Sequence, residues 1–201
     1  WTDGPDWSCH GRKYNGDFHG VITDNPEYFK VFANEALRRG YEIHIISGGP
    51  KATIEKFLQQ WGIKYTDIFA IVDYYDARGC VTFYENGEFK VPDKLWNCAK
   101  AAYCDENGIN IHIDDTMSYS EGFTTPFCFY DVKTRHCRTL DQKVINLEVS
   151  PKAALDDIET FVRENRKKWF CRRLPARYKK SRIIPPGFFW IKLLLLRSYK
   201  I

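Results

Sequence analysis

The chain has 201 residues, of which 44% are hydrophobic, 28% charged and 16% aromatic. This length and composition suit a folded domain with a buried core, and they exclude a chain that is wholly disordered, collagen-like or coiled-coil. The apolar runs are too short to cross a bilayer as a helix, so we expect no transmembrane segment.

The charges are unevenly distributed. Residues 163–201 hold 13 of the 30 Lys and Arg side chains but one of the 26 Asp and Glu side chains, so this segment carries +12 and residues 1–162 carry −8. A strongly basic segment is typical of contact with an anionic partner. Four interpretations stay open for it: docking or assembly with protein, binding of nucleic acid, binding of an anionic membrane surface, and a sequence error or fusion.

Seven cysteines are present, and no two are separated by only two residues. This pattern favours reduced thiols over a disulfide framework. Residues 1–16 also lack the cationic and then apolar pattern of a signal peptide. We therefore expect a cytoplasmic protein. The oligomeric state cannot be predicted from these features.

Helices and strands are predicted to alternate along the chain, because some segments repeat apolar residues at helical spacing and others form short apolar or alternating runs. In chain order, the predicted elements are a helix over 26–39, a strand over 41–46, a helix over 51–61, a strand over 68–72, a helix over 94–106, strands over 109–113 and 127–130, and a helix over 151–168. This order is typical of a mostly parallel sheet covered by helices.

Two further features complete the predicted organisation. Residues 81–91 contain Asn86 and Gly87 between two alternating runs, which predicts a β-hairpin inserted into the α/β domain. Beyond residue 170 the helical or strand periodicity is lost. We therefore predict a domain over residues 1–170 and a separate basic, aromatic and apolar tail over residues 171–201.

Chemically reactive side chains follow the predicted strands. Asp17 is expected to end a strand before the first long helix, Ser47 follows the apolar run of the strand over 41–46, and Asp114 and Asp115 follow the strand over 109–113. The carboxyl ends of parallel strands share one edge of a sheet, so these side chains are expected to meet there. With Lys94 at the start of the preceding helix, they form a set that suits phosphoryl transfer.

The ordered motifs resemble those of the haloacid dehalogenase (HAD) superfamily of Mg²⁺-dependent phosphohydrolases. The motifs are Asp17 to Thr23, the strand that ends in Ser47, the lysine, and the segment that ends in Asp114 and Asp115, and the resemblance covers residues 14–131. It implies a three-layer α/β sandwich with a mostly parallel, Rossmann-like sheet, and the hairpin would be a small insertion.

The resemblance also implies a role for each matching residue. Asp17 matches the nucleophile that accepts the phosphoryl group as an aspartyl-phosphate. Ser47 and the backbone of Gly48 match the phosphate-binding loop. Lys94 matches the lysine that neutralises charge on the nucleophile and the phosphate, and Lys100 is the rival for this role.

The metal ligands implied by the resemblance are oxygen atoms that would bind Mg²⁺. They belong to Asp17, the backbone carbonyl of His19, Asp114 and Asp115. His19 stands where the family usually has a second aspartate that acts as acid and base. Imidazole exchanges protons near neutral pH, so we expect His19 to take this role.

The predicted activity is Mg²⁺-dependent hydrolysis of a phosphomonoester. Only one helix fits between Thr23 and Ile43, and only a helix, a short strand and the hairpin fit between Ser47 and Lys94. The site is therefore expected to lack a cap domain, which suits a nucleotide or a macromolecular phosphate as the substrate. The alternative is a catalytically weakened HAD-like module that binds nucleic acid, a membrane surface or a protein through its basic tail.

Overall fold

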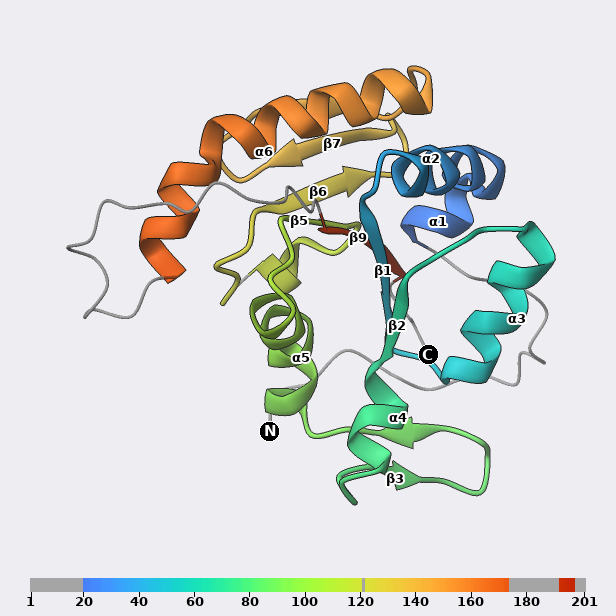
Figure 1. The fold of residues 1–201 in the computed structure, drawn as a ribbon. Coiled ribbons are helices and arrows are strands. Elements are labelled where there is room, and N and C mark those ends of the chain that lie inside the picture. Colours follow the sequence, from blue (N-terminus) through green and yellow to red (C-terminus); the bar gives the residue numbers. More distant parts are fainter. Residues whose placement is uncertain (1–19, 121, 174–191, 198–201) are drawn as a thin grey trace.

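The computed structural model describes residues 20–120, 122–173 and 192–197, with side chains described as far as residue 165. Within these ranges the protein is a mixed α/β structure (Figure 1). Its helices are α1 (Val21–Asp24), α2 (Pro26–Arg38), α3 (Lys51–Trp61), α4 (Ile71–Asp76), α5 (Asp93–Glu106), the 3₁₀ helix η1 (Met117–Ser120) and α6 (Pro151–Arg173). Its strands are β1 (Glu42–Ser47), β2 (Asp67–Ala70), β3 (Thr82–Phe83), β4 (Phe89–Lys90), β5 (Ile111–Asp114), β6 (Phe127–Asp131), β7 (His136–Thr139), β8 (Val144–Asn146) and β9 (Lys192–Arg197).

Seven strands form one mixed sheet in the order β2-β1-β9-β5-β6-β7-β8. The pairs from β2 to β6 are parallel, whereas β6–β7 and β7–β8 are antiparallel. This arrangement confirms the prediction of a largely parallel sheet in an α/β protein. The antiparallel strands β7 and β8 were not predicted, because each is only three or four residues long and has a single fully buried apolar residue.

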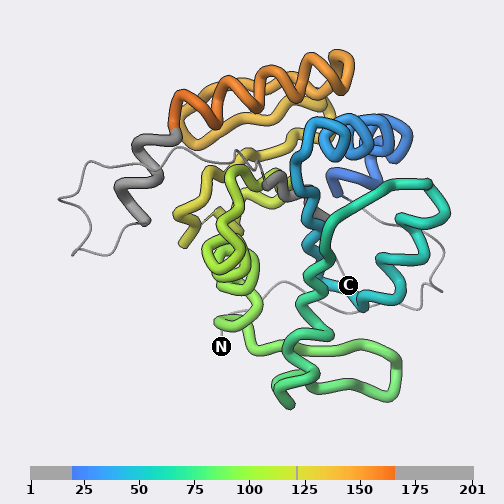
Figure 2. The backbone as a smooth tube through the Cα atoms, viewed as in Figure 1, coloured from blue at the N-terminus to red at the C-terminus, as the bar shows by residue number. Residues whose placement is uncertain are grey.

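Helices cover both sides of the sheet, with α5 on one side of β1 and β2 and α3 on the other (Figure 1). Helices α2 and α6 lie side by side although more than 100 residues separate them in sequence (Figure 2). The guanidinium of Arg39, at the end of α2, joins them by pairing with Asp156 at 2.7 Å and Glu159 at 2.8 Å.

The two faces of the sheet differ in chemistry, because side chains alternate along each strand. Ile43 and Ile45 of β1, like Ile111 and Ile113 of β5, are fully buried apolar residues. The intervening polar residues contact α5: Tyr103 bonds to His44, Cys104 to His112 and Lys100 to Asp114. Helix α5 thus packs on a polar stripe of buried side chains.

The predicted hairpin is confirmed. Strands β3 and β4 pair antiparallel, Phe83 opposite Phe89, in a small sheet of their own. Gly87 adopts a φ of +84°, which glycine tolerates and other residues resist. One boundary differs from prediction, because Ile71 and Val72 begin α4 rather than end β2. A short apolar run does not distinguish a buried strand from a buried helical turn.

Two stretches of the predicted tail, residues 171–173 and 192–197, are described. Helix α6 continues to Arg173, and β9 occupies the middle of the parallel strands, paired with β1 on one side and β5 on the other. A run of four leucines suits a strand buried on both faces. Such a run has no alternation, so the sequence pattern did not reveal the strand.

The central position of β9 can be tested at Leu194, because this residue is in register with His44 of β1 and His112 of β5. We expect Leu194→Pro to lower the free energy of unfolding by several kcal/mol, since it removes an N–H from the ladder and each unsatisfied buried group costs about 1–3 kcal/mol. Leu194→Val keeps the N–H and should cost about 1 kcal/mol. Urea denaturation followed by circular dichroism measures both, and equal stability of the two variants would contradict the central position of β9.

Candidate functional site

The candidate site lies where β1 and β5 end. Ser47 is the last residue of β1 and Asp114 the last of β5, and β9 lies between these strands. Two strand spacings separate their backbones by about 10 Å. The prediction that Ser47 and Asp114 share one edge of the sheet is therefore confirmed.

Asp114 is the most constrained side chain of the site. It is fully buried, and its Oδ2 accepts hydrogen bonds from Lys100 Nζ at 3.0 Å and His112 Nε2 at 3.4 Å, while its Oδ1 accepts from the amide of Thr116 at 2.9 Å. Burial alone would raise the pKa of this carboxyl, but the Lys100 ammonium and the hydrogen bonds outweigh it and lower the pKa to about 2. Asp114 is thus an anion at neutral pH.

His112 is the neutral neighbour of this anion. Complete burial lowers its pKa to about 4, although Asp114 acts in the opposite direction. A neutral ring has one N–H, and the contact with Asp114 requires it on Nε2. Nδ1 then accepts from the thiol of Cys104 at 3.6 Å. His112 therefore orients Asp114 without adding charge.

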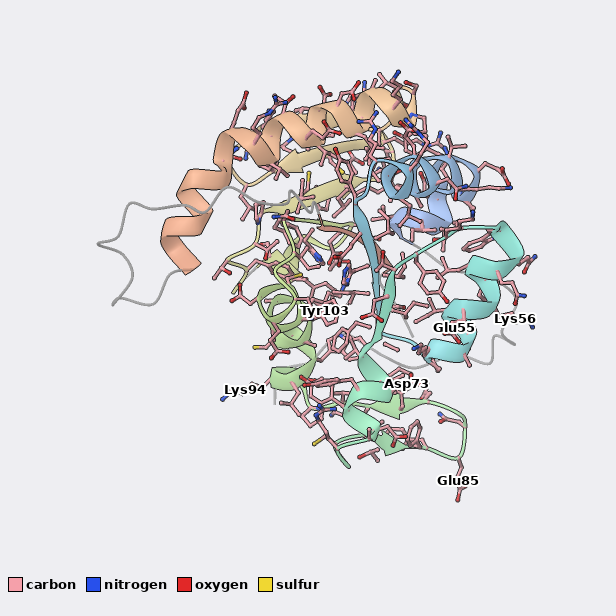
Figure 3. All side chains as sticks on the ribbon, in the orientation of Figure 1. Glu55, Lys56, Asp73, Glu85, Lys94 and Tyr103 are labelled. Atoms are coloured by element: carbon pink, nitrogen blue, oxygen red, sulfur yellow. The ribbon has the colours of Figure 1, made fainter. Side chains whose placement is uncertain are left out.

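Lys100, not Lys94, is the lysine that the structure brings to Asp114. The Lys100 side chain is only 3% exposed, whereas Lys94 lies exposed in the first turn of α5 and points away from the sheet (Figure 3). Six residues of α-helix rotate a side chain by about 240° beyond a full turn, so the two lysines lie on different faces. Of the two lysines proposed from the sequence, Lys100 is therefore the one that contacts Asp114.

Tyr119 covers Lys100 from the other side. The Lys100 Nζ lies 4.0 Å from the centre of the Tyr119 ring, over its face, and the Tyr119 hydroxyl accepts a hydrogen bond from Trp96 Nε1 at 3.1 Å. Sequence reasoning missed both aromatic residues. The only available signal was the spacing of Trp96 and Lys100, four residues apart on one helix.

The loop after β1 is held by hydrogen bonds that involve its backbone. Ser47 is fully buried, and its Oγ accepts from the amide of Gly49 at 3.4 Å. Gly48 accepts from the amide of Val72 at 3.3 Å, and Asp73 accepts from the amide of Lys51 at 2.9 Å. Asp73, labelled in Figure 3, was not predicted and connects α4 to the start of α3.

The remaining predicted site residues are only partly covered by the structure. Asp115 is partly buried, and its Oδ1 accepts from the Thr116 hydroxyl at 3.4 Å. Asp17 and His19 lie outside the described residues. In the ranges that are described, no three His, Cys, Asp or Glu side chains converge as a metal site. Asp114 and Asp115 thus lie next to each other at the end of β5, and metal binding by the four residues stays a prediction.

No family model, curated protein or solved structure matches this chain. Among the described residues, no helix is long and apolar enough to cross a membrane.

Because Lys100 is paired with Asp114, we expect substitutions of two lysines on the same helix to differ greatly in their effect on the free energy of unfolding. Lys100→Met should lower the free energy of unfolding by about 3–5 kcal/mol, because it leaves a buried carboxylate without its cation. Lys94→Met, the matched control, should change it by less than about 0.5 kcal/mol, since its side chain is exposed. Urea denaturation measures both, and a similar small effect of both substitutions would rule out the buried pair.

The lowered pKa of His112 predicts loss of stability in mild acid. Between pH 6.5 and 4 an unfolded chain binds a proton at this histidine and the folded chain does not, so the free energy of unfolding should fall by about 3 kcal/mol as the pH decreases. The measurement is urea denaturation at several pH values with EDTA present. His112→Asn should remove most of this slope, and an unchanged slope in that variant would assign the acid sensitivity to other groups.

Proposed function

We propose that this protein is a Mg²⁺-dependent phosphomonoester hydrolase of the HAD type that forms an aspartyl-phosphate on Asp17. The observation that carries the proposal is the buried Lys100–Asp114 ion pair at the edge of the sheet where Ser47 ends β1. Phosphoryl transfer needs a hydroxyl, an ammonium and an ionised carboxylate close together. The sheet with helices on both sides is consistent with the three-layer sandwich of that family.

The position of α1 supports the inclusion of Asp17. Helix α1 contacts β9, and its Asp24 accepts hydrogen bonds from Tyr130 at 2.7 Å and Arg135 at 3.1 Å, which tie it to the β6–β7 region. Asp17 precedes Gly20 by three residues, a distance of at most about 11 Å along the chain. The contact of α1 with β9 therefore supports including Asp17, which comes four residues before α1 in sequence, in the proposed site.

Strand β9 bears on one difference between this sequence and the pattern of the HAD superfamily. The family has a buried apolar strand before the nucleophile, whereas residues 10–16 are polar and glycine-containing. The structure has an apolar strand, Lys192–Arg197, between β1 and β5. We infer that this C-terminal strand fills the central position of the sheet.

The donor chemistry of the described residues fits Mg²⁺. Asp114 is ionised at neutral pH, and Asp115 adds a neighbouring carboxylate, so both offer the hard oxygen atoms that this ion prefers. Asp17 and the carbonyl of His19 would complete the ligand set. When bound, the ion neutralises negative charge on the phosphate and on the clustered carboxylates.

The protein's own groups would carry the transfer in two steps. A carboxylate oxygen of Asp17 attacks phosphorus, the bond from phosphorus to the alcohol oxygen breaks, and His19 gives that oxygen a proton. His19 then takes a proton from water, whose oxygen attacks the aspartyl-phosphate and releases inorganic phosphate. Ser47 hydrogen-bonds the transferring phosphoryl group, and Lys100 neutralises its charge.

The substrate class follows from what surrounds the site. Between Ser47 and Lys100 the chain forms α3, β2, α4, the β3–β4 hairpin and the start of α5, so this part contains no separate cap domain. A site without a cap domain would suit a large phosphorylated substrate or a nucleotide better than a small sugar phosphate, which a cap would enclose.

Release of phosphate is the direct test. Nucleotides, sugar phosphates, phosphopeptides and phosphorylated oligonucleotides are incubated with the protein in Mg²⁺ or in EDTA. We expect turnover that requires Mg²⁺ and that falls at least about a thousandfold in Asp17→Asn, because the amide is a poor nucleophile.

Two controls make this result specific. Lys94→Met should retain activity, because its side chain is exposed and points away from the sheet (Figure 3). Circular dichroism of each variant should match that of the wild type. Full activity in Asp17→Asn would refute the mechanism. If the folded wild-type protein releases phosphate from none of these substrates, the result would favour the alternative function, a HAD-like binding module.

A further inference from the structure

Lys100 has an unusual environment for a buried lysine. Its ammonium lies 3.0 Å from the Asp114 carboxylate and over the face of the Tyr119 ring, 4.0 Å from the ring centre. Removing an ammonium from water costs several kcal/mol. A single carboxylate shared with His112 compensates only part of this cost, so the aromatic face supplies the second favourable contact.

The Tyr119 ring is itself held in place by α5. Trp96 donates from its indole Nε1 to the Tyr119 hydroxyl at 3.1 Å, and Trp96 lies one helical turn before Lys100. Phe89 of the hairpin packs against Trp96 with the ring centres 6.3 Å apart. Helix α5 therefore supplies both the cation and one hydrogen bond to the edge of the ring, in addition to the contact between the ammonium and the face of the ring.

The geometry leaves one donor of the ammonium for a ligand. Nζ has three N–H groups. Among the described residues, Asp114 accepts from one, and the Tyr119 ring faces the nitrogen from another side. The two contacts restrict the rotation of the long side chain, and the remaining donor thereby acquires a fixed direction.

We propose that Tyr119 is a positioning residue, whose ring holds the Lys100 ammonium against Asp114 and directs its remaining N–H toward a phosphate anion. The contact with phosphate rests on the proposed function, whereas the contact between ring and ammonium does not. Tyr119 itself touches no reacting atom in this account and acts through Lys100.

The experiment uses the full chain and compares Tyr119→Leu with Tyr119→Phe. The phenylalanine keeps the aromatic face and loses only the hydroxyl, whereas leucine removes the face. The first readout is the NMR signal of the Lys100 ε-methylene protons, which an aromatic face shifts upfield. We expect the shift to persist in Tyr119→Phe and to disappear in Tyr119→Leu. An unshifted signal in the wild type would overturn the proposal.

A double-mutant cycle measures the strength of the contact. Tyr119→Leu should lower the folding equilibrium constant about tenfold more in the wild type than in Lys100→Met, because the ring has no cation to hold in the second background. Equal effects in both backgrounds would overturn the proposal. The NMR comparison needs no Lys100 variant, so it decides the question if Lys100→Met does not fold.

The third readout concerns phosphate. In Tyr119→Leu the dissociation constant for inorganic phosphate, from calorimetric titration in Mg²⁺, should rise about tenfold, whereas Tyr119→Phe should stay within about twofold of the wild type. Unchanged binding in Tyr119→Leu would refute the role toward phosphate. If the NMR shift is lost in Tyr119→Leu while the wild type has no phosphatase activity, Tyr119 remains a positioning residue and the proposed hydrolase is rejected. Failure of the positioning role and failure of the proposed function are therefore distinguishable.

Discussion

The site depends on one buried ion pair. Lys100 and Asp114 are almost completely removed from water, and two ions in that environment are tolerated only where each has further partners. Those partners come from three different elements: His112 from β5, the Thr116 amide from the turn after it, and Tyr119 from η1. Because the buried pair requires these hydrogen bonds and the aromatic contact, it fixes how α5, β5 and η1 pack against one another.

A second constraint is the position of β9. The parallel part of the sheet would be divided without it, because the described strands β1 and β5 pair with β9 and not with each other. Part of the basic segment 163–201 is therefore a structural strand, and another part is the end of α6.

The sequence predicted elements with strong local signals and missed those that depend on distant ones. The helix that begins at Pro26 has Asn25 as its cap, which accepts from the Tyr28 amide at 3.2 Å, and the hairpin has Asn86 and Gly87. Ser47 and Asp114 were predicted to share an edge because parallel strands dictate it. The choice between Lys94 and Lys100 required knowing which face of α5 meets the sheet, and the role of Tyr119 required knowing where η1 lies. Neither is encoded in a window of neighbouring residues.

The topology also has a consequence for how the protein is made. β9 is the last strand in sequence but lies in the interior of the sheet, so β1 and β5 remain open edges until synthesis has passed residue 197. Unpaired apolar edges are sites of aggregation, and pairing of segments this distant in sequence is slow. Completion of the sheet must therefore wait until residue 197 has been synthesised, and until then the edges of β1 and β5 are exposed to pairing with other chains.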